Sequence, residues 1–447
     1  MEHLPFELAE YIADHLHAYT CQPFSRWDCH TKESRKDIQA FRQVCRGFNH
    51  ASAKVYAETI GEKPFRLNAK GIQQLLDLSQ HPEIASYITS LTFADELCFH
   101  ADAGKVFEAA RNLTTILGRN GVQEPASEPP LELDKQRERI QELDNIYNSY
   151  LVSQESEIGD SKLVNDLILA LKGLPNIRSL RIFPEEIDGT LKRIFTQDQY
   201  KLMNDIAESP DMPSMSLFPG GHRPDTLRTV LQAVASAGIQ LSEFSSANLP
   251  GSETLQVIRL DLAEDILCGA LKDVRTMRIT ADSQRAYPSE LDADPEANSV
   301  RRDALAKFIS CAPNLEVLEL NAGGALWEFG VERRHFSLRK FFTDVRLPRL
   351  RRFVLQGPVL LDNANEFPEL QQFLDGHRET LDTLGFHEVE TRSSAVAVHC
   401  AYCVWTDFVI WLKHFPHLEL EVKGVLGSEE FTEMLFSEPL GWIRRAQ

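Results

Sequence analysis

The stretch Arg301–Leu320, RRDALAKFISCAPNLEVLEL, decides the fold, because it places a helix, a turn and a strand in succession. Leu305, Phe308 and Ile309 follow the three- and four-residue spacing of one apolar helix face. Pro313 ends the helix, since the residue before a proline disfavours helical dihedral angles. The segment LEVLEL after the turn mixes apolar and charged positions in the manner of a short, half-buried strand.

The same succession of helix, turn and strand recurs beyond residue 60. Its other full copies are LVNDLILALKGLPNIRSLRI (163–182), LRTVLQAVASAGIQLSEFSS (227–246) and LQQFLDGHRETLDTLGFHEV (370–389). Partial copies end in the strands SLTF (90–93), VRTMRIT (274–280), LRRFVLQ (350–356) and LELEV (418–422). We take as strand centres Leu91, Leu180, Phe244, Met277, Leu318, Val354, Leu384 and Leu420. The later centres are about 30–41 residues apart, longer than the 20–29 residues of regular leucine-rich repeats.

The L(P)NLxxLxL pattern of these copies nevertheless resembles a degenerate leucine-rich repeat array, as in fungal F-box-like proteins. The resemblance implies an irregular α/β solenoid over residues 61–447, with strands on the inner face and helices outside. A globular α/β domain with parallel strands and crossover helices has the same alternation and stays open as the alternative.

The first sixty residues show a different, purely helical pattern. Leu8, Ile12 and Leu16 form one apolar stripe after the opening Leu4-Pro5, and proline suits the start of a helix. A second helix is predicted at about 35–57, with Ser34 and Asp37 as its capping box. Its apolar face consists of Ile38, Phe41, Val44, Cys45 and Phe48.

These two halves, LPxEL…I…L and DIxxFxxVCRxF, resemble an F-box over residues 1–60. The segment at about 17–36, polar and with two cysteines, is longer than the usual F-box connection and is interpreted as an inserted loop. The resemblance implies docking to a Skp-family adaptor and, through it, to a cullin scaffold. The residues that match the family's contact helices are Leu4, Pro5, Leu8, Ile12, Ile38, Phe41, Val44, Cys45 and Phe48.

The composition excludes several other classes of protein. The 447 residues carry 47 Lys and Arg against 66 Asp and Glu, a formal charge of −19, which argues against nucleic-acid binding. The opening residues MEHLPFELAEYI lack the basic segment of a secretory signal, and no apolar stretch is long enough to cross a membrane. We therefore expect a cytoplasmic or nuclear protein in which the eight cysteines are not a disulfide framework.

Neither metal nor enzyme motifs emerge from the sequence. Of two cysteine clusters, Cys21 with Cys29 and His30, and Cys400 with Cys403, only the second has the close spacing of a zinc ligand pair. We interpret these cysteines as core or idle thiols and expect no metal, no cofactor and no catalytic residue. A metal enzyme or an unrecognised hydrolase stays a third, weaker possibility.

Two insertions and one basic run are further candidates for binding. Residues 119–157 begin as a Pro/Glu linker, and residues 281–300 are acidic and contain proline. A basic run extends from Arg333 to Arg352 and either grips an acidic partner or forms a solvated face balanced by nearby acids.

The sequence thus predicts a non-enzymatic substrate receptor of a Skp–cullin–F-box ubiquitin ligase, with an unknown target protein bound by the repeat array. The alternative is a repeat scaffold for protein–protein interaction without a link to ubiquitin.

Overall fold

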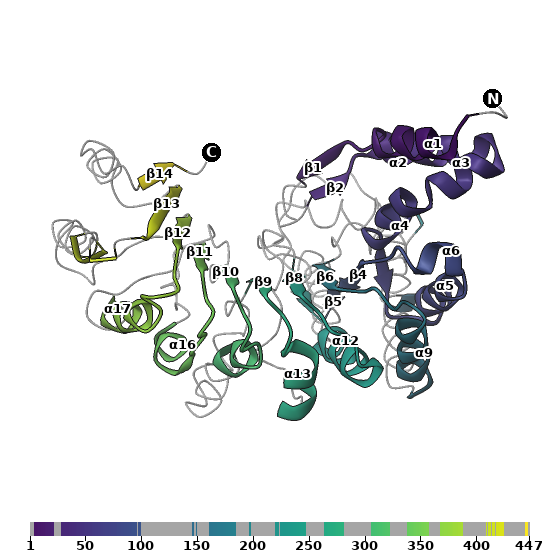
Figure 1. The fold of residues 1–447 in the computed structure, drawn as a ribbon. Helices are drawn as coiled ribbons and strands as arrows, with labels where there is room; N and C mark the ends of the chain where they lie inside the picture. Colours follow the sequence, from purple (N-terminus) through teal and green to yellow (C-terminus); the bar gives the residue numbers. More distant parts are fainter. Residues whose placement is uncertain are drawn as a thin grey trace, which may run out of the picture.

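The fold is α/β, as predicted, in the computed structural model of the chain (Figure 1). The structure describes residues 4–21, 28–95, 97–99, 145–146, 149, 161–184, 196–197, 220–222, 224–246, 263–280, 305–321, 338–356, 367–387, 408, 410–412, 414–415, 417–423 and 443–445. Among these residues, no helix has both the length and the apolar character needed to cross a lipid bilayer.

One parallel sheet of ten strands runs through the chain from residue 64 to residue 445. Its strands lie side by side in the order in which they occur in the sequence, without a crossover that reverses direction. They are β3 (Pro64–Arg66), β4 (Ser90–Asp95), β6 (Ser179–Pro184), β8 (Glu243–Ser246), β9 (Thr276–Thr280), β10 (Val317–Asn321), β11 (Arg352–Gln356), β12 (Thr383–His387), β13 (Glu419–Lys423) and β14 (Ile443–Arg445). Each new strand therefore adds to the same growing edge. A separate antiparallel pair joins β5 (Leu97–Phe99) to β7 (Gly220–His222).

The helices between the strands cover one side of this sheet, which curves so that the strands lie inside the arc (Figure 1). They are α5 (Ala69–Ser79), α6 (Pro82–Ala85), α9 (Ser161–Lys172), α12 (Pro224–Ala237), α13 (Glu264–Leu271), a short helix at 305–310, α16 (Arg339–Asp344) and α17 (Phe367–Asp375). Their apolar faces and the sheet residues turned toward them form one continuous buried core. Stacking is therefore what buries each unit, because a single helix and strand cannot do so alone.

The apolar residues at the strand centres stand in one row across nine strands. The register pairs Leu91, Leu180, Phe244, Met277, Leu318, Phe353, Leu384, Leu420 and Ile443 successively. Seven of the eight predicted centres are thus confirmed. The exception is Val354, because the residue in the row is its neighbour Phe353. Both side chains are buried, so the apolar pattern of the sequence could not show which of the two stands in the row.

A repeated backbone motif joins each unit to the one before it. The N–H groups of Arg275 and Thr276 both donate to the carbonyl of Ser242, at 2.9 and 3.1 Å. Those of Glu316 and Val317 donate in the same way to Arg275. The carbonyls that accept such pairs are those of Thr89, Arg178, Ser242, Arg275, Glu316 and Arg351. The repeat is therefore present in the hydrogen bonds as well as in the apolar pattern.

Asparagine side chains add a second link between units. Asn176 and Asn314, each after a proline at the turn, donate to the carbonyls of Ser86 and Lys272 at 2.7 and 2.9 Å. The prolines end the helices and the asparagines tie the resulting turns to the preceding unit.

A bundle of four helices precedes the sheet: α1 (Phe6–Asp14), α2 (Lys32–Val44), α3 (Arg46–Ala51) and α4 (Ala53–Gly61). The predicted single helix at 35–57 is wrong, because Cys45 adopts an extended conformation and Ser52 separates α3 from α4. Dividing the helix lets both α2 and α3 pack against neighbouring helices, since Phe41 stacks on Phe48 with ring centroids 4.4 Å apart.

The start of α2 also differs from the prediction. Its N-cap is Thr31, whose hydroxyl accepts from the N–H of Ser34 at 3.1 Å, so the predicted capping box of Ser34 and Asp37 is wrong. Ser34 lies inside the helix and donates to the carbonyl of Leu16 at 2.5 Å, tying α2 to the end of α1. The predicted loop at 17–36 contains a two-stranded hairpin, β1 (Tyr19–Cys21) and β2 (Asp28–His30), followed by the first turn of α2.

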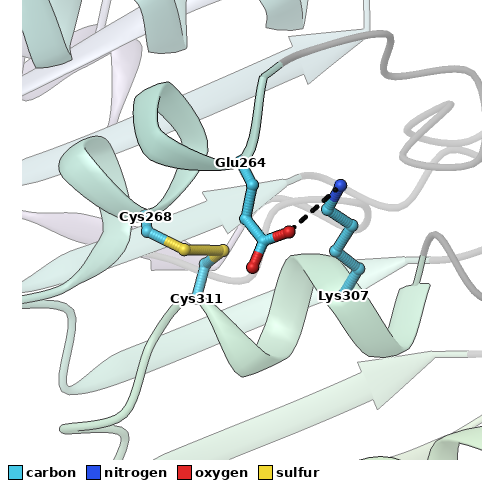
Figure 2. The surroundings of a disulfide bond; sticks show 4 residues. All are labelled: Glu264, Cys268, Lys307 and Cys311. Carbon is cyan, nitrogen blue, oxygen red and sulfur yellow. Dashed lines mark ion pairs between the residues drawn. A yellow bond between two sulfur atoms is a disulfide. The ribbon is translucent and has the colours of Figure 1, made fainter.

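A disulfide links two neighbouring helices of the array. Cys268 on α13 bonds to Cys311 at the end of the 305–310 helix, with Cα atoms 4.4 Å apart (Figure 2). One turn earlier on each helix, Glu264 and Lys307 form an ion pair at 3.5 Å. No disulfide framework was expected from the eight cysteines, and this bond joins two cysteines that stacking of the helices brings together.

Candidate functional site

The nine residues predicted to bind an adaptor divide into inward and outward positions on the helical bundle. Ile38 is fully buried and Phe48 nearly so, which makes them part of the bundle's own core. Leu4, Ile12 and Phe41 are half-buried, and Leu4 and Phe41 pack against buried clusters of the bundle. The outward residues are Pro5, Leu8, Val44 and Cys45. Of the nine, these four offer the most surface to a partner.

Exposed apolar side chains are concentrated in this bundle. Of the eight large apolar residues exposed in the described part of the chain, five belong to the first 44 residues: Phe6, Leu8, Tyr11, Tyr19 and Val44. Leu8 is 45% exposed and Val44 is 50% exposed. Exposed apolar side chains mark interaction sites where they gather into a patch, so their positions on the bundle decide the candidate surface.

Packing in the bundle places Leu8 and Val44 toward the same end. Ala9, which follows Leu8, shares a buried cluster with Phe48, Ala51 and the half-buried Phe41. Val44 lies one turn beyond Phe41 on α2. We call the exposed residues Pro5, Phe6, Leu8, Val44 and Cys45 the apolar end of the bundle.

The hairpin β1–β2 lies at the opposite end. Its residue His30 bonds to Glu62, which follows α4. The N–H of Ala18, the residue before β1, donates to the hydroxyl of Ser34 at 3.2 Å. Figure 1 shows the hairpin on the far side of the bundle from the N-terminus and α3. The described parts of the insertion, 17–21 and 28–36, therefore lie away from the apolar end.

A ladder of opposite charges forms a second candidate surface, on the sheet face that turns away from the helices. Arg278 bonds Glu243 at 2.5 Å and lies 3.4 Å from Glu319 on the next strand. Arg352 continues the ladder from Glu319 to Glu421. These side chains are about a quarter exposed, so the pairs are accessible to solvent and contribute modestly to stability.

Arg352 is the last residue of the basic run, for which the sequence left open either an acidic partner or balance by nearby acids. Its guanidinium is paired with two carboxylates, as expected if the run is balanced by nearby acids. Arg346, Arg349 and Arg351 are exposed. The beginning of the run, 333–337, lies outside the described residues, as do the insertion 281–300 and, apart from 145–146 and 149, the insertion 119–157.

Two histidines and two glutamates meet where the hairpin touches α4. His17 Nδ1 lies 2.7 Å from His30 Nε2, and His30 Nδ1 lies 2.7 Å from Glu62 Oε1. Glu62 also accepts the N–H of His30 at 3.0 Å and pairs with Arg35 at 3.1 Å. Together with Glu58, His17 and His30 form the one group of metal-ligand type among the described residues.

Protonation in this cluster is governed by burial and by these contacts. Burial alone would raise the pKa of Glu62, but hydrogen bonds from His30 and the charge of Arg35 hold it below its usual value. Burial and the neighbouring His30 lower the pKa of His17. Burial and the nearby carboxylates raise the pKa of the Tyr19 hydroxyl to about 12. The cluster therefore holds an ionised Glu62 and a neutral His17 imidazole at pH 7.

The cluster was not predicted from the sequence, where His30 stands next to Cys29 and near Cys21 and was grouped with them. Cys29 is buried, Cys21 is described only in its backbone, and Cys400 and Cys403 lie outside the described residues. The separation of His17, His30 and Glu58 along the chain matches no ligand motif. Only a hairpin between the two histidines would have brought them together, and the segment was interpreted as a loop.

Comparison with known proteins identifies no relative, because no protein-family model matches the chain and no curated protein sequence matches it significantly.

Proposed function

We propose that the chain is the substrate-recognition subunit of a Skp–cullin–F-box ubiquitin ligase. The observation that carries this proposal is the exposed apolar end of the bundle, which contains four of the nine residues that match the F-box pattern. Helix faces with aliphatic anchors are the surfaces by which helical modules dock into a partner's groove. The inward residues, such as Ile38, would then hold the docking surface in shape.

The array would supply the target-binding surface of this receptor. The proposed class is a degenerate leucine-rich repeat solenoid, supported by the sequential parallel strands, the row of strand-centre residues and the recurring hydrogen bonds between units. The charged face of its sheet is accessible along several units and suits a polar segment of a target. Transfer of ubiquitin would follow from proximity, because holding a target near a charged carrier raises its effective concentration.

The test uses the exposed residues alone, so that folding and binding are separated. Leu8→Asp with Val44→Asp in the full chain should abolish co-purification with a purified Skp-family adaptor, while the thermal unfolding temperature stays close to that of the wild type. The matched control is Leu169→Asp, because Leu169 on α9 is 59% exposed but belongs to the array. Retained adaptor binding in the double variant would overturn the proposed docking surface.

The alternative, a repeat scaffold without a ubiquitin link, predicts a different result with the wild-type chain. Such a scaffold would bind no Skp-family adaptor in any variant, and its first helices would serve to cap the array. Affinity purification of the intact chain therefore separates the two functions, since adaptor and cullin are recovered together only with a ligase receptor.

A further inference from the structure

We propose that His17, His30 and Glu58 form a binding site for one divalent transition-metal ion, of the zinc class, that fastens the β1–β2 hairpin to α4. The three residues come from three separate segments: the chain before β1, strand β2 and helix α4. Their ligand atoms lie within 4.8 Å of one another. The site is separate from the apolar end of the bundle and does not depend on the proposed function.

The ligand set indicates which metal the site would take. Two imidazole nitrogens and one carboxylate suit zinc and its neighbours among the transition metals, whereas calcium and magnesium require mainly oxygen ligands. Three protein ligands leave a fourth tetrahedral position for water. Tetrahedral zinc bonds of about 2.0–2.1 Å separate two ligand atoms by about 3.3 Å. The two imidazole nitrogens, 2.7 Å apart, would need to part by about half an ångström.

Glu62 is the independent observation that points to a metal. Its carboxylate is nearly buried and accepts the Nδ1–H of His30, whose side chain is fully buried. This bond fixes the ring so that the lone pair of Nε2 points toward His17. Histidines that bind metals commonly donate their other N–H to such a carboxylate, which orients the ring and makes the ligand more basic. Glu62 is held in turn by Arg35 and by the backbone N–H of His30.

The competing explanation is a hydrogen-bonded bridge without metal. In it, His17 Nδ1–H would donate to His30 Nε2, and the Tyr19 hydroxyl, 2.9 Å from His17 Nδ1, would donate to Glu58. Both explanations use the same contacts, but only a metal site makes the stability of the hairpin depend on added zinc. Binding of an ion to the folded chain alone raises its stability as the free zinc concentration exceeds the dissociation constant.

The experiment measures zinc content and thermal unfolding of the full chain, after removal of metal with a chelator and addition of zinc. The wild type should take up one equivalent more than the double variant His17→Asn, Glu58→Gln, and zinc should raise the unfolding temperature of the wild type but not of this variant. The matched control is His50→Asn, Glu83→Gln, which alters an exposed histidine–glutamate pair at 3.4 Å between α3 of the bundle and α6, and should behave as the wild type.

Glu62→Gln tests the orienting role of the carboxylate and should weaken zinc binding by about 10–100-fold. Cobalt substituted for zinc reports the coordination directly, because four-coordinate cobalt absorbs strongly in the visible range. Circular dichroism of each variant verifies that the bundle is folded. Absence of zinc uptake by the wild type, or equal uptake and equal stabilisation in the His17, Glu58 double variant, would overturn the site and leave the hydrogen-bonded bridge.

Discussion

Arg352 on β11 reaches across strand β12 to bind Glu421 on β13 with two hydrogen bonds of 2.5 and 2.9 Å. The residue of β12 that pairs with Glu421 is Gly385, which has no side chain to stand between them. A Cβ at that glycine would also lie 2.9 Å from the side chain of Val354. The glycine thus permits a contact between strands that are not neighbours.

We expect Arg352→Ala and Glu421→Ala to be coupled by about 0.5–1 kcal/mol in a double-mutant cycle of the free energy of unfolding. The coupling is modest because the two side chains are 30% and 19% exposed. High salt should reduce it, since screening weakens pairs that are in contact with water. Chemical denaturation at low and high ionic strength measures both effects, and purely additive single variants would contradict the assignment.

His377 should make stability depend on pH. Its Nδ1–H donates to the carbonyl of Phe373 at 2.6 Å, and its Nε2 accepts the N–H of Leu347 at 3.1 Å, so the ring is held neutral between two units. Burial lowers its pKa below 6.5, assisted by Arg346 and opposed by the hydrogen bond to Phe373. The unfolded chain therefore binds the proton more readily than the folded chain does.

The contribution of His377 is complete above pH 6.5 and is lost as the pH falls toward the lowered pKa of the folded state, with a slope of at most about 1.4 kcal/mol per pH unit. His377→Leu should unfold more easily at pH 7, by about 1–3 kcal/mol, because the N–H of Leu347 loses its acceptor. The difference between variant and wild type should shrink between pH 7 and pH 5. A constant difference across that range would contradict this role.

Two glycines should respond oppositely to substitution by alanine. Gly238 follows α12 with a φ of 71°, and the N–H of Ile239 after it closes the helix by donating to Val234 at 3.2 Å. Gly238→Ala should destabilise the fold by about 1–2 kcal/mol, because an L residue is strained in this conformation. Gly269, inside α13, has room for a methyl group, with the nearest atom at 3.7 Å. Gly269→Ala should stabilise by about 0.5–1 kcal/mol, and equilibrium unfolding compares the two.

The bond between Cys268 and Cys311 should strengthen the middle of the array. It closes a loop with a sequence separation of 43 residues, for which chain entropy predicts about 4 kcal/mol, and engineered or native bonds typically give about 2–4 kcal/mol. We expect Cys268→Ser with Cys311→Ser to lower the free energy of unfolding by this amount. Alkylation with and without reductant, read by mass, first establishes that the bond is formed. Glu264→Gln serves as a control and should cost under about 0.5 kcal/mol, since its ion pair is exposed.

The alternation of helix and strand could be predicted from the sequence because each unit repeats it with its own apolar pattern. Leu318 and Leu384 were found as strand centres by that pattern, and the register aligns them through Phe353. The error at Val354 has a physical cause, because both faces of β11 are buried at that point and alternation is lost. The division of the second helix at Cys45 was missed, since an apolar face continues through the break.

The candidate surfaces were harder to predict, because exposure depends on packing. Leu8 and Ile38 look equally suited to bind a partner in the sequence, yet one is exposed and the other is in the core. The pairing of Arg352 with Glu421 depends on which strands are neighbours. The contact of His17 with His30 depends on a hairpin for which the sequence carries no turn motif. The residue types indicated which side chains could bind a partner, but their pairing and exposure depend on strand register and packing.

The sequential order of the strands bears on how the chain folds. Each rung of backbone hydrogen bonds joins units that follow one another, as from Arg275 to Glu316 and from Glu316 to Arg351. Strands that follow one another in the sheet are paired, so each rung closes a shorter loop than pairing of more distant strands would require. The long segment between Thr89 and Arg178 is closed at a small additional entropic cost, because that cost grows only slowly with length. Insertions can therefore lengthen between fixed rungs without changing the order in which the units stack.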